Sequence, residues 1–168
     1  MQKQTPQAVI IFGGGGQGKT LIDLLRLLEA YTIAGIVDDG LLKGSQVMGV
    51  PVLGGASLLP ELRGQGIGLA LNAVGGIGNV GARIGVFEQL EEAGFDFPTV
   101  VHPSACVEDS ADLEAGVQVG ALTYIGSLAR VGFGTLINSH VCVSHDCRIG
   151  RVVNLSPGAL LAGGVHVE

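Results

Sequence analysis

The stretch VQVGALTYIGSLARVGFGTLINSHVCVSHDCRIG, residues 117–150, carries an aliphatic residue at every sixth position. A smaller residue, such as Ala129 or Cys147, stands two positions before each of them. The full series of aliphatic positions is Val107, Leu113, Val119, Ile125, Val131, Ile137, Val143, Ile149, Leu155, Leu161 and Val167. A six-residue period predicts a parallel β-helix, in which three short strands form one triangular coil of eighteen residues.

Glycine follows the aliphatic residue at positions 120, 126, 132 and 150. Because glycine adopts backbone angles that other residues avoid, it is common where a chain turns. We therefore expect these glycines to occupy the turns of the repeat. The composition favours such a thin, tightly wound structure, since the chain has 29 glycines and only 4% aromatic residues.

The first hundred residues follow a different pattern, in which apolar strands alternate with helices. The predicted helices are one containing Leu21, Leu24, Leu25 and Leu28 and one over 80–94. The predicted strands are 8–12, 32–37, 67–74 and 98–101. This alternation predicts a small parallel sheet of the βαβ kind. We expect an α/β domain over 1–101 and a β-helix domain over 102–168. The repeat stops partway through a coil at residue 168, so we expect the second domain to be truncated C-terminally.

The segment IIFGGGGQGKT, residues 10–20, satisfies two phosphate-binding patterns. One is the P-loop of a nucleotide triphosphatase, which also needs Mg²⁺ and a carboxylate at a strand end, as Asp38 or Asp39 could supply. The other is a dinucleotide fingerprint, in which glycines let a diphosphate approach a helix N-terminus and an acid meets the ribose or base. Asp38 lies 20 residues beyond Gly18, as the second pattern requires. A turn with no ligand is the third interpretation.

The chain resembles the NeuD/PglD-type sugar acetyltransferases. The segments that carry the resemblance are IIFGGGGQGKT, IVDDG, GVPVLGG, VVHPSA and SHVCVSHDCRIG. The resemblance implies a Rossmann-like nucleotide-sugar domain followed by a left-handed β-helix. It also implies a homotrimer that transfers acetyl from acetyl-CoA to a UDP-4-amino-dideoxy sugar in glycan biosynthesis. It favours the nucleotide-sugar interpretation of the glycine-rich segment over the P-loop.

The resemblance also implies the site residues. His145 is the expected catalytic base, with Asp146 orienting it, while Gly163 and Asn154 are the expected contacts of acetyl-CoA. The repeat independently places His145 on the outside of the coil, two positions after Val143, with Gly163 at the equivalent position one coil away. The expected nucleotide-sugar contacts are Gly13, Gly14, Gly15, Gly16, Gln17, Gly18, Asp38 and Asp39.

The sequence departs from the family pattern at two of these positions. Gln17 stands where the family commonly has a histidine, and Asn154 stands where some members have a second histidine, nine residues after the first. Contacts made by an imidazole at either position therefore cannot be carried over.

Three other functions are compatible with the residues. One is O-acetylation of sialic acid or another sugar. Another is a metalloenzyme like the γ-class carbonic anhydrases, because His140 and His145 are five apart, although the third histidine position holds Ser104. Cys142 and Cys147 are further candidate metal ligands beside the two histidines, but Cys147 occupies an inward position of the coil and cannot share a face with His145. The last is a non-catalytic trimer that binds a nucleotide sugar. We expect no bound metal.

Charge and hydropathy exclude other classes. A net charge of −6 argues against binding nucleic acid. No stretch reaches the roughly 18 uncharged apolar residues that a membrane span needs. The three cysteines occur in a chain without an apparent export signal, so we expect reduced thiols and a cytoplasmic protein.

Overall fold

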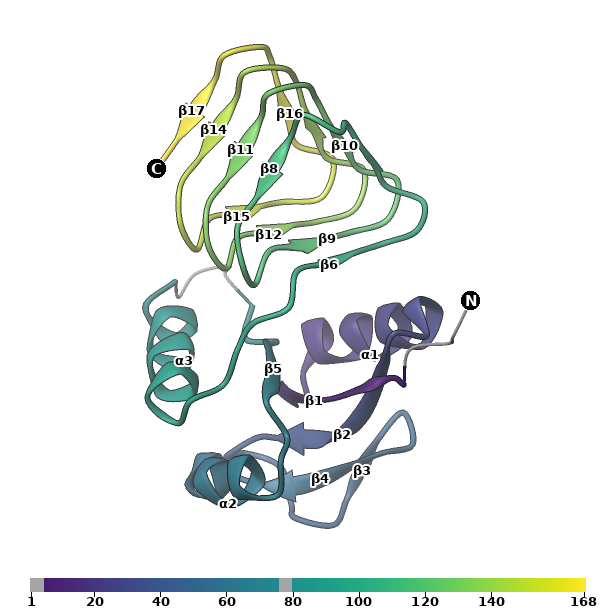
Figure 1. The fold of residues 1–168 in the computed structure, drawn as a ribbon, viewed down its shortest axis with the longest axis vertical. Helices are drawn as coiled ribbons and strands as arrows, with labels where there is room; N and C mark the ends of the chain where they lie inside the picture. Colours follow the sequence, from purple (N-terminus) through teal and green to yellow (C-terminus); the bar gives the residue numbers. More distant parts are fainter. Residues whose placement is uncertain (1–4, 76–79) are drawn as a thin grey trace. The chain divides into compact units, whose positions relative to one another are not determined.

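The computed structural model describes residues 5–75 and 80–168. These residues form two compact units, the first containing residues up to 75 together with 81–97, and the second containing 98–168. Figure 1 shows that the first unit combines helices with a sheet, whereas the second consists of stacked coils bearing short strands. The chain is thus an α/β domain followed by a parallel β-helix.

The first unit is built on a five-stranded sheet with the order β3-β4-β2-β1-β5. Its strands are β1 (Gln7–Phe12), β2 (Tyr31–Val37), β3 (Gln46–Val47), β4 (Val50–Gly54) and β5 (Leu69–Asn72). Its helices are α1 (Gly16–Leu28), the 3-10 turn η1 (Ala56–Leu58), α2 (Leu59–Gly64) and α3 (Val80–Glu92). The strands predicted over 8–12, 32–37 and 67–74 are confirmed within a few residues, and so are both helices.

Alternation along β1 explains how this sheet is covered on both faces. Ile10 and Phe12 are buried in a cluster that includes Leu62 of α2 and Leu90 of α3. Their neighbours along the strand point to the opposite face, because successive side chains of a strand alternate. The helix α1 packs against β1 and β2 and buries Leu21 together with the rest of its apolar stripe.

The sequence analysis missed β3, β4, η1 and α2. The strand β4 contains Pro51 and ends at Gly54, and both residues are more typical of turns than of strands. It pairs parallel with β2 and antiparallel with β3, so the sheet is not purely parallel as predicted. The pairing, rather than the local sequence, makes this segment a strand.

The second unit repeats two-residue strands in three four-stranded sheets. One sheet contains β6 (Val100–Val101), β9 (Gln118–Val119), β12 (Leu136–Ile137) and β15 (Asn154–Leu155). The second contains β7 (Cys106–Val107), β10 (Tyr124–Ile125), β13 (Cys142–Val143) and β16 (Leu160–Leu161). The third contains β8 (Asp112–Leu113), β11 (Arg130–Val131), β14 (Arg148–Ile149) and β17 (His166–Val167). Paired residues are eighteen apart, as in Ile125 and Val143, which confirms the predicted coil.

The strand predicted over 98–101 belongs to this second unit. Val100 and Val101 pair in parallel with Gln118 and Val119 of β9. The prediction that 98–101 joins the N-terminal sheet was therefore wrong. A short apolar strand pairs equally well with either sheet, so only its position in space decides its partner.

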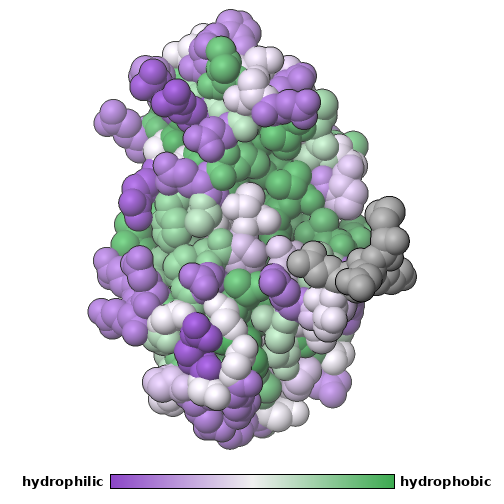
Figure 2. Space-filling model, in the orientation of Figure 1, coloured by the Kyte–Doolittle hydropathy of each residue, from purple (hydrophilic) through white to green (hydrophobic). Residues whose placement is uncertain are grey.

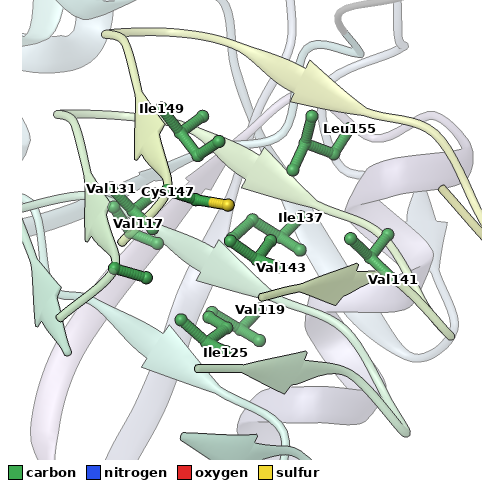
Figure 3. Packing of buried hydrophobic residues seen from close by; sticks show 11 residues of the cluster. Val117, Val119, Ile125, Val131, Ile137, Val141, Val143, Cys147, Ile149 and Leu155 are labelled. Carbon is green, nitrogen blue, oxygen red and sulfur yellow. The ribbon is translucent and has the colours of Figure 1, made fainter. Parts of the chain in front are cut away.

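The aliphatic positions of the repeat form the core of the β-helix. Ile125, Ile137 and Val143 are fully buried, and the small residues Ala129 and Cys147 are buried beside them. Figure 3 shows the labelled side chains of this core, Cys147 among them, pointing toward one another inside the coils. The strict period thus follows from geometry, because each coil has room for one large and one small inward residue on every side.

The glycines of the repeat are needed for a reason other than the predicted one. Gly120, Gly126, Gly132 and Gly150 are absent from the positive-φ residues among those described. A Cβ at Gly126 would lie 2.8 Å from the backbone nitrogen of His145, and one at Gly132 would lie 2.7 Å from the carbonyl carbon of Gly150. These glycines therefore permit close approach of the next coil.

The left-handed residues of the turns come three positions after the aliphatic ones. They recur every six residues and include non-glycine residues with φ near 60°, such as His140 and Asp146. The complete series is Gly116, Leu122, Leu128, Gly134, His140, Asp146, Val152, Gly158 and Gly164. Such angles are unfavourable for most side chains, so the backbone pairing of the coils maintains them.

Candidate active site

His145 and Asp146 form one corner of the β-helix, between β13 and β14. The Asp146 backbone, with φ of 59°, donates its N–H to the carbonyl oxygen of Ser127 at 3.0 Å. The carbonyl oxygen of His145 accepts the N–H of Gly164 at 2.9 Å. Because both neighbouring coils hydrogen-bond to this corner, its two side chains project from a fixed backbone.

The two side chains contact each other directly. The distance from His145 Nδ1 to Asp146 Oδ2 is 2.7 Å, and the side chains are 69% and 58% exposed. A carboxylate on Nδ1 favours the tautomer that carries its proton there. The lone pair of Nε2 is then available to accept a proton, as a general base requires.

Gly163 lies directly against this imidazole. A Cβ added at Gly163 would lie 2.5 Å from Cε1 and 2.6 Å from Nε2 of His145. The structure therefore brings together three of the four residues predicted for catalysis and acetyl-CoA contact. A side chain at 163 would therefore displace the imidazole.

The fourth residue, Asn154, lies elsewhere on the β-helix. It belongs to β15, in a different sheet from β13, which precedes His145. Its Oδ1 accepts a hydrogen bond from Asn138 Nδ2 at 2.9 Å, and the same nitrogen donates to the carbonyl of Leu155 at 2.7 Å. The bond from Asn138 thus gives Asn154 a structural role in linking two coils.

The glycine-rich segment forms the turn between β1 and α1. Gly13 has a φ of 109°, and Gly18 packs so closely on the carbonyl of Gly13 that no side chain fits there. Gly15 and Gly16 are exposed, and a Cβ at either would meet nothing within 4 Å. The helix begins with no side-chain cap and no acidic residue in its first turn. Such an N-terminus favours an anion through its N–H groups and dipole.

The two aspartates that follow β2 are engaged by backbone groups. Asp38 accepts hydrogen bonds from the N–H of Gly14 through Oδ2 and of Gly40 through Oδ1, each at 2.8 Å. Asp39 Oδ1 accepts the N–H of Ala56 at 2.9 Å. Asp38 thus ties the glycine-rich turn to the end of β2. Gln17 lies half-buried in the first turn of α1.

The residues of the alternative metal site are not brought together. His140 lies at the corner between β12 and β13, whereas Cys147 is fully buried and its Sγ donates to the carbonyl of Ala162 at 3.2 Å. Among the described residues, no three histidine, cysteine or acidic side chains are grouped as metal ligands. Within the same residues, no helix combines the length and apolarity of a membrane span.

Comparison with known proteins identifies relatives of both units. Residues 8–90 match the family model of the PglD N-terminal domain. PerB from Caulobacter crescentus, solved in complex with CoA and GDP-perosamine, is 38% identical, with a TM-score of 0.87 over 95% of this chain and 73% of that one. The acetyltransferase domain of PglB from Neisseria gonorrhoeae, solved with acetyl coenzyme A, is 32% identical, with a TM-score of 0.84 over 96% of this chain and 76% of that one.

A shorter match links part of the chain to another acyltransferase. The acyl-[acyl-carrier-protein]--UDP-N-acetylglucosamine O-acyltransferase of Saccharophagus degradans is 42% identical over 52 residues, which are 31% of this chain and 20% of the relative. The match thus spans about a fifth of that enzyme's length.

The β-helix of six-residue repeats and the matches to an acetyltransferase domain and an O-acyltransferase define the chain as an acyltransferase. The α/β domain that precedes it narrows the class further, through the matches to the PglD N-terminal domain and to PerB. The chain belongs to the PglD-type sugar acetyltransferases.

Proposed function

We propose that this protein transfers acetyl from acetyl-CoA to the amino group of a nucleotide-linked amino sugar, as a step of glycan biosynthesis. The observation that carries the proposal is the His145–Asp146 pair beside Gly163. The PerB complex with CoA and GDP-perosamine, at 38% identity, supports both co-substrates. The sugar is a 4-amino-dideoxy sugar, linked to UDP or, as in the PerB complex, to GDP.

The corner residues divide the chemistry between them. His145 Nε2 removes a proton from the sugar amine as the amine nitrogen attacks the thioester carbonyl carbon of acetyl-CoA. Asp146 stabilises the imidazolium through its 2.7 Å contact with Nδ1. The backbone N–H of Gly163 binds the carbonyl oxygen as negative charge develops on it. The C–S bond then breaks, and the proton held by the imidazolium passes to the CoA sulfur, which leaves as a thiol.

The glycine-rich turn is the proposed site for the nucleotide sugar. Its diphosphate lies on the N-terminus of α1, over the residues Gly13 to Gly18, where Gly15 and Gly16 leave open space. Gln17 and Asp38 border this position, and Asp39, which binds the N–H of Ala56, follows next in the chain. We assign this role to a Rossmann-like domain that ends at residue 97, and catalysis to a left-handed β-helix of residues 98–168.

The β-helix also has a surface suited to a second copy of the chain. The outward residues of the sheet formed by β7, β10, β13 and β16 are Cys106, Tyr124, Cys142 and Leu160. Leu160 is 80% exposed, and apolar residues reach the surface elsewhere too, as the view in Figure 2 shows. The sheet formed by β8, β11, β14 and β17 presents charged residues instead, such as Arg130 and Arg148. We assign the apolar face to contacts within a homotrimer in the cytoplasm, where acetyl-CoA is made.

A substrate panel tests the function. Purified protein is supplied with acetyl-CoA and with GDP-perosamine, a UDP-4-amino-dideoxy sugar, CMP-sialic acid or free sialic acid. The proposal expects N-acetylation of one of the amino sugars, detected by mass spectrometry and by CoA release. Acetylation of a sialic acid hydroxyl would favour the O-acetyltransferase instead, and bound zinc or iron with CO₂ hydration would favour the metalloenzyme. Light scattering measures the oligomeric state, and a monomer at working concentration would contradict the trimer.

A further inference from the structure

A buried arginine lies behind the glycine-rich turn. Arg83 occupies the second turn of α3 and is fully buried, on the same helix face as Val86, Phe87 and Leu90. An arginine at such an apolar position is unusual, because a charge loses its hydration when it is buried. Burial lowers the pKa of Arg83 to about 10, so the side chain is still charged at neutral pH.

The guanidinium binds the end of the strand that lies beside β1. Arg83 Nη1 donates hydrogen bonds to the carbonyl oxygens of Asn72 at 3.1 Å and Val74 at 2.7 Å. Asn72 completes the network, since its Nδ2 donates to the carbonyl of Arg83 at 2.8 Å and its Oδ1 accepts the N–H of Val74 at 3.0 Å. Three of these hydrogen bonds join residues 72–74 to Arg83 of α3, and the bond from Val74 to Asn72 closes the segment internally.

This segment in turn forms one wall of the glycine-rich turn. The N–H of Ala73 donates to the carbonyl of Phe12 at 2.7 Å. A Cβ at Gly13 would lie 3.1 Å from the carbonyl carbon of Ala73, so the two backbones are already in close contact. On its other side, the N–H of Gly13 donates to the carbonyl of Val37 at 2.8 Å. A displacement of residues 72–74 would thus pass directly to Gly13.

We infer that Arg83 is a positioning residue for the nucleotide-sugar diphosphate, acting through Asn72, Ala73 and Gly13 on the turn that would bind it. The inference rests on the proposed function. Being fully buried, Arg83 cannot touch the ligand, but it sets the backbone on which the phosphates lie. Its positive charge near the carboxyl end of the sheet also favours an anion there. Acetyl-CoA is expected to meet residues of the β-helix, so its binding is independent of Arg83.

The test is a comparison of the two substrates in Arg83→Met and Arg83→Lys. Arg83→Met removes the donors and the charge while keeping the length of the side chain, and Arg83→Lys restores the charge with fewer donors. Leu90→Ala is the matched control, since it weakens the same side of α3 but removes none of the hydrogen bonds between Arg83 and residues 72–74. Calorimetry measures the Kd for GDP and UDP, steady-state kinetics measures KM for each co-substrate, and circular dichroism reports folding.

The inference expects Arg83→Met to weaken binding of the nucleotide about tenfold or more, because the backbone groups that would bind the diphosphate lose their preorganised position. The KM for acetyl-CoA should change less than about twofold, Arg83→Lys should recover part of the loss, and Leu90→Ala should leave nucleotide binding unchanged. Equal changes in both KM values, or an unchanged nucleotide Kd in a folded variant, would overturn it. If Arg83→Met does not fold, Arg83→Lys decides alone by the same criteria.

The proposed reaction and the inference fail in different ways. If the wild type binds GDP or UDP but acetylates neither amino sugar, the reaction is wrong and the inference is still decided by the Kd values. If the wild type binds neither nucleotide, the site on α1 is wrong, and the inference falls with it.

Discussion

The imidazole of His145 lies against the backbone of Gly163, one coil further along the β-helix, with no space between them for a methyl group. The eighteen-residue coil places these two positions side by side on adjacent turns of the chain. The same contact that excludes a side chain brings the backbone of Gly163 beside the proposed base. The geometry of the proposed active site is therefore a direct product of the repeat.

Gly163→Ala should displace the imidazole and lower activity while the fold survives. The added Cβ would lie 2.5 Å from the imidazole ring of His145, so the ring must rotate. Because the His145 side chain is exposed, it has room to do so, and we expect it to lose its contact with Asp146. We expect kcat to fall about ten- to a hundredfold, with a much smaller change in the thermal midpoint. Gly85→Ala, at a helical position with open space around it, is the control and should leave kcat unchanged. Wild-type activity in Gly163→Ala would contradict the assigned site.

Asp146→Asn should lower kcat without unfolding the corner. Asparagine tolerates the left-handed backbone that Asp146 adopts, so the turn is retained. The amide no longer stabilises an imidazolium, and it can present an N–H to Nδ1 and so favour the wrong tautomer. We expect a fall of about tenfold or more in kcat with little change in either KM. His145→Ala should lose more, and an equal rate in all three proteins would remove the pair from the mechanism.

Thr135→Val should destabilise the β-helix. Thr135 is fully buried, its Oγ1 donates to the carbonyl of Gly150 at 2.8 Å, and the same oxygen accepts the N–H of Val153 at 3.1 Å. Valine has nearly the same shape but leaves both backbone groups without this partner, at a cost of about 1–3 kcal/mol. Urea denaturation measures the free energy of unfolding. Thr135→Ser keeps the hydroxyl and should lose less, so the opposite order would exclude the hydrogen bonds as the cause.

Tyr124 should ionise at a higher pH than an ordinary tyrosine. Its hydroxyl donates to Glu108 Oε1 at 3.1 Å, and this hydrogen bond, assisted by the carboxylate charge, raises the pKa of the phenol above 10.0. Because the folded pKa is the higher one, any stability from this contact is present below the unfolded pKa and is lost as the pH rises through the folded one. Absorbance titration of a Tyr31→Phe background isolates Tyr124. Glu108→Gln should lower its pKa toward the ordinary value, and no shift would contradict the contact.

The β-helix could be predicted in detail because its determinant is local and repeated. Each six-residue unit must place one large and one small residue inward, whatever the rest of the chain does, so Ile125 and Cys147 could be assigned to the interior from the period alone. The period also predicted that His145 faces outward and that Gly163 is its neighbour. The activity itself came from resemblance, since a period specifies a scaffold and not a reaction.

The tertiary structure decided what depends on pairing between distant segments. The strand β6 is as short and apolar as a buried strand of the N-terminal sheet could be. Only its pairing with β9 assigns it to the β-helix. Pro51 is atypical of a strand, so β4 could not be predicted from its own sequence, and its parallel pairing with β2 is what makes it a strand. The glycine at 126 also looks like a turn residue, although the backbone of the next coil is what requires it.

The sequence by itself determined the coil, its core and the neighbours of His145, because inward and outward positions follow from the six-residue period. Only the tertiary structure showed that Asp38 binds the glycine-rich turn and that Arg83 holds residues 72–74 beneath it. Those contacts join residues that share no period and lie far apart or on different elements. Their physical basis is the need of buried charges and backbone groups for partners, and the folded chain alone decides which partners are near.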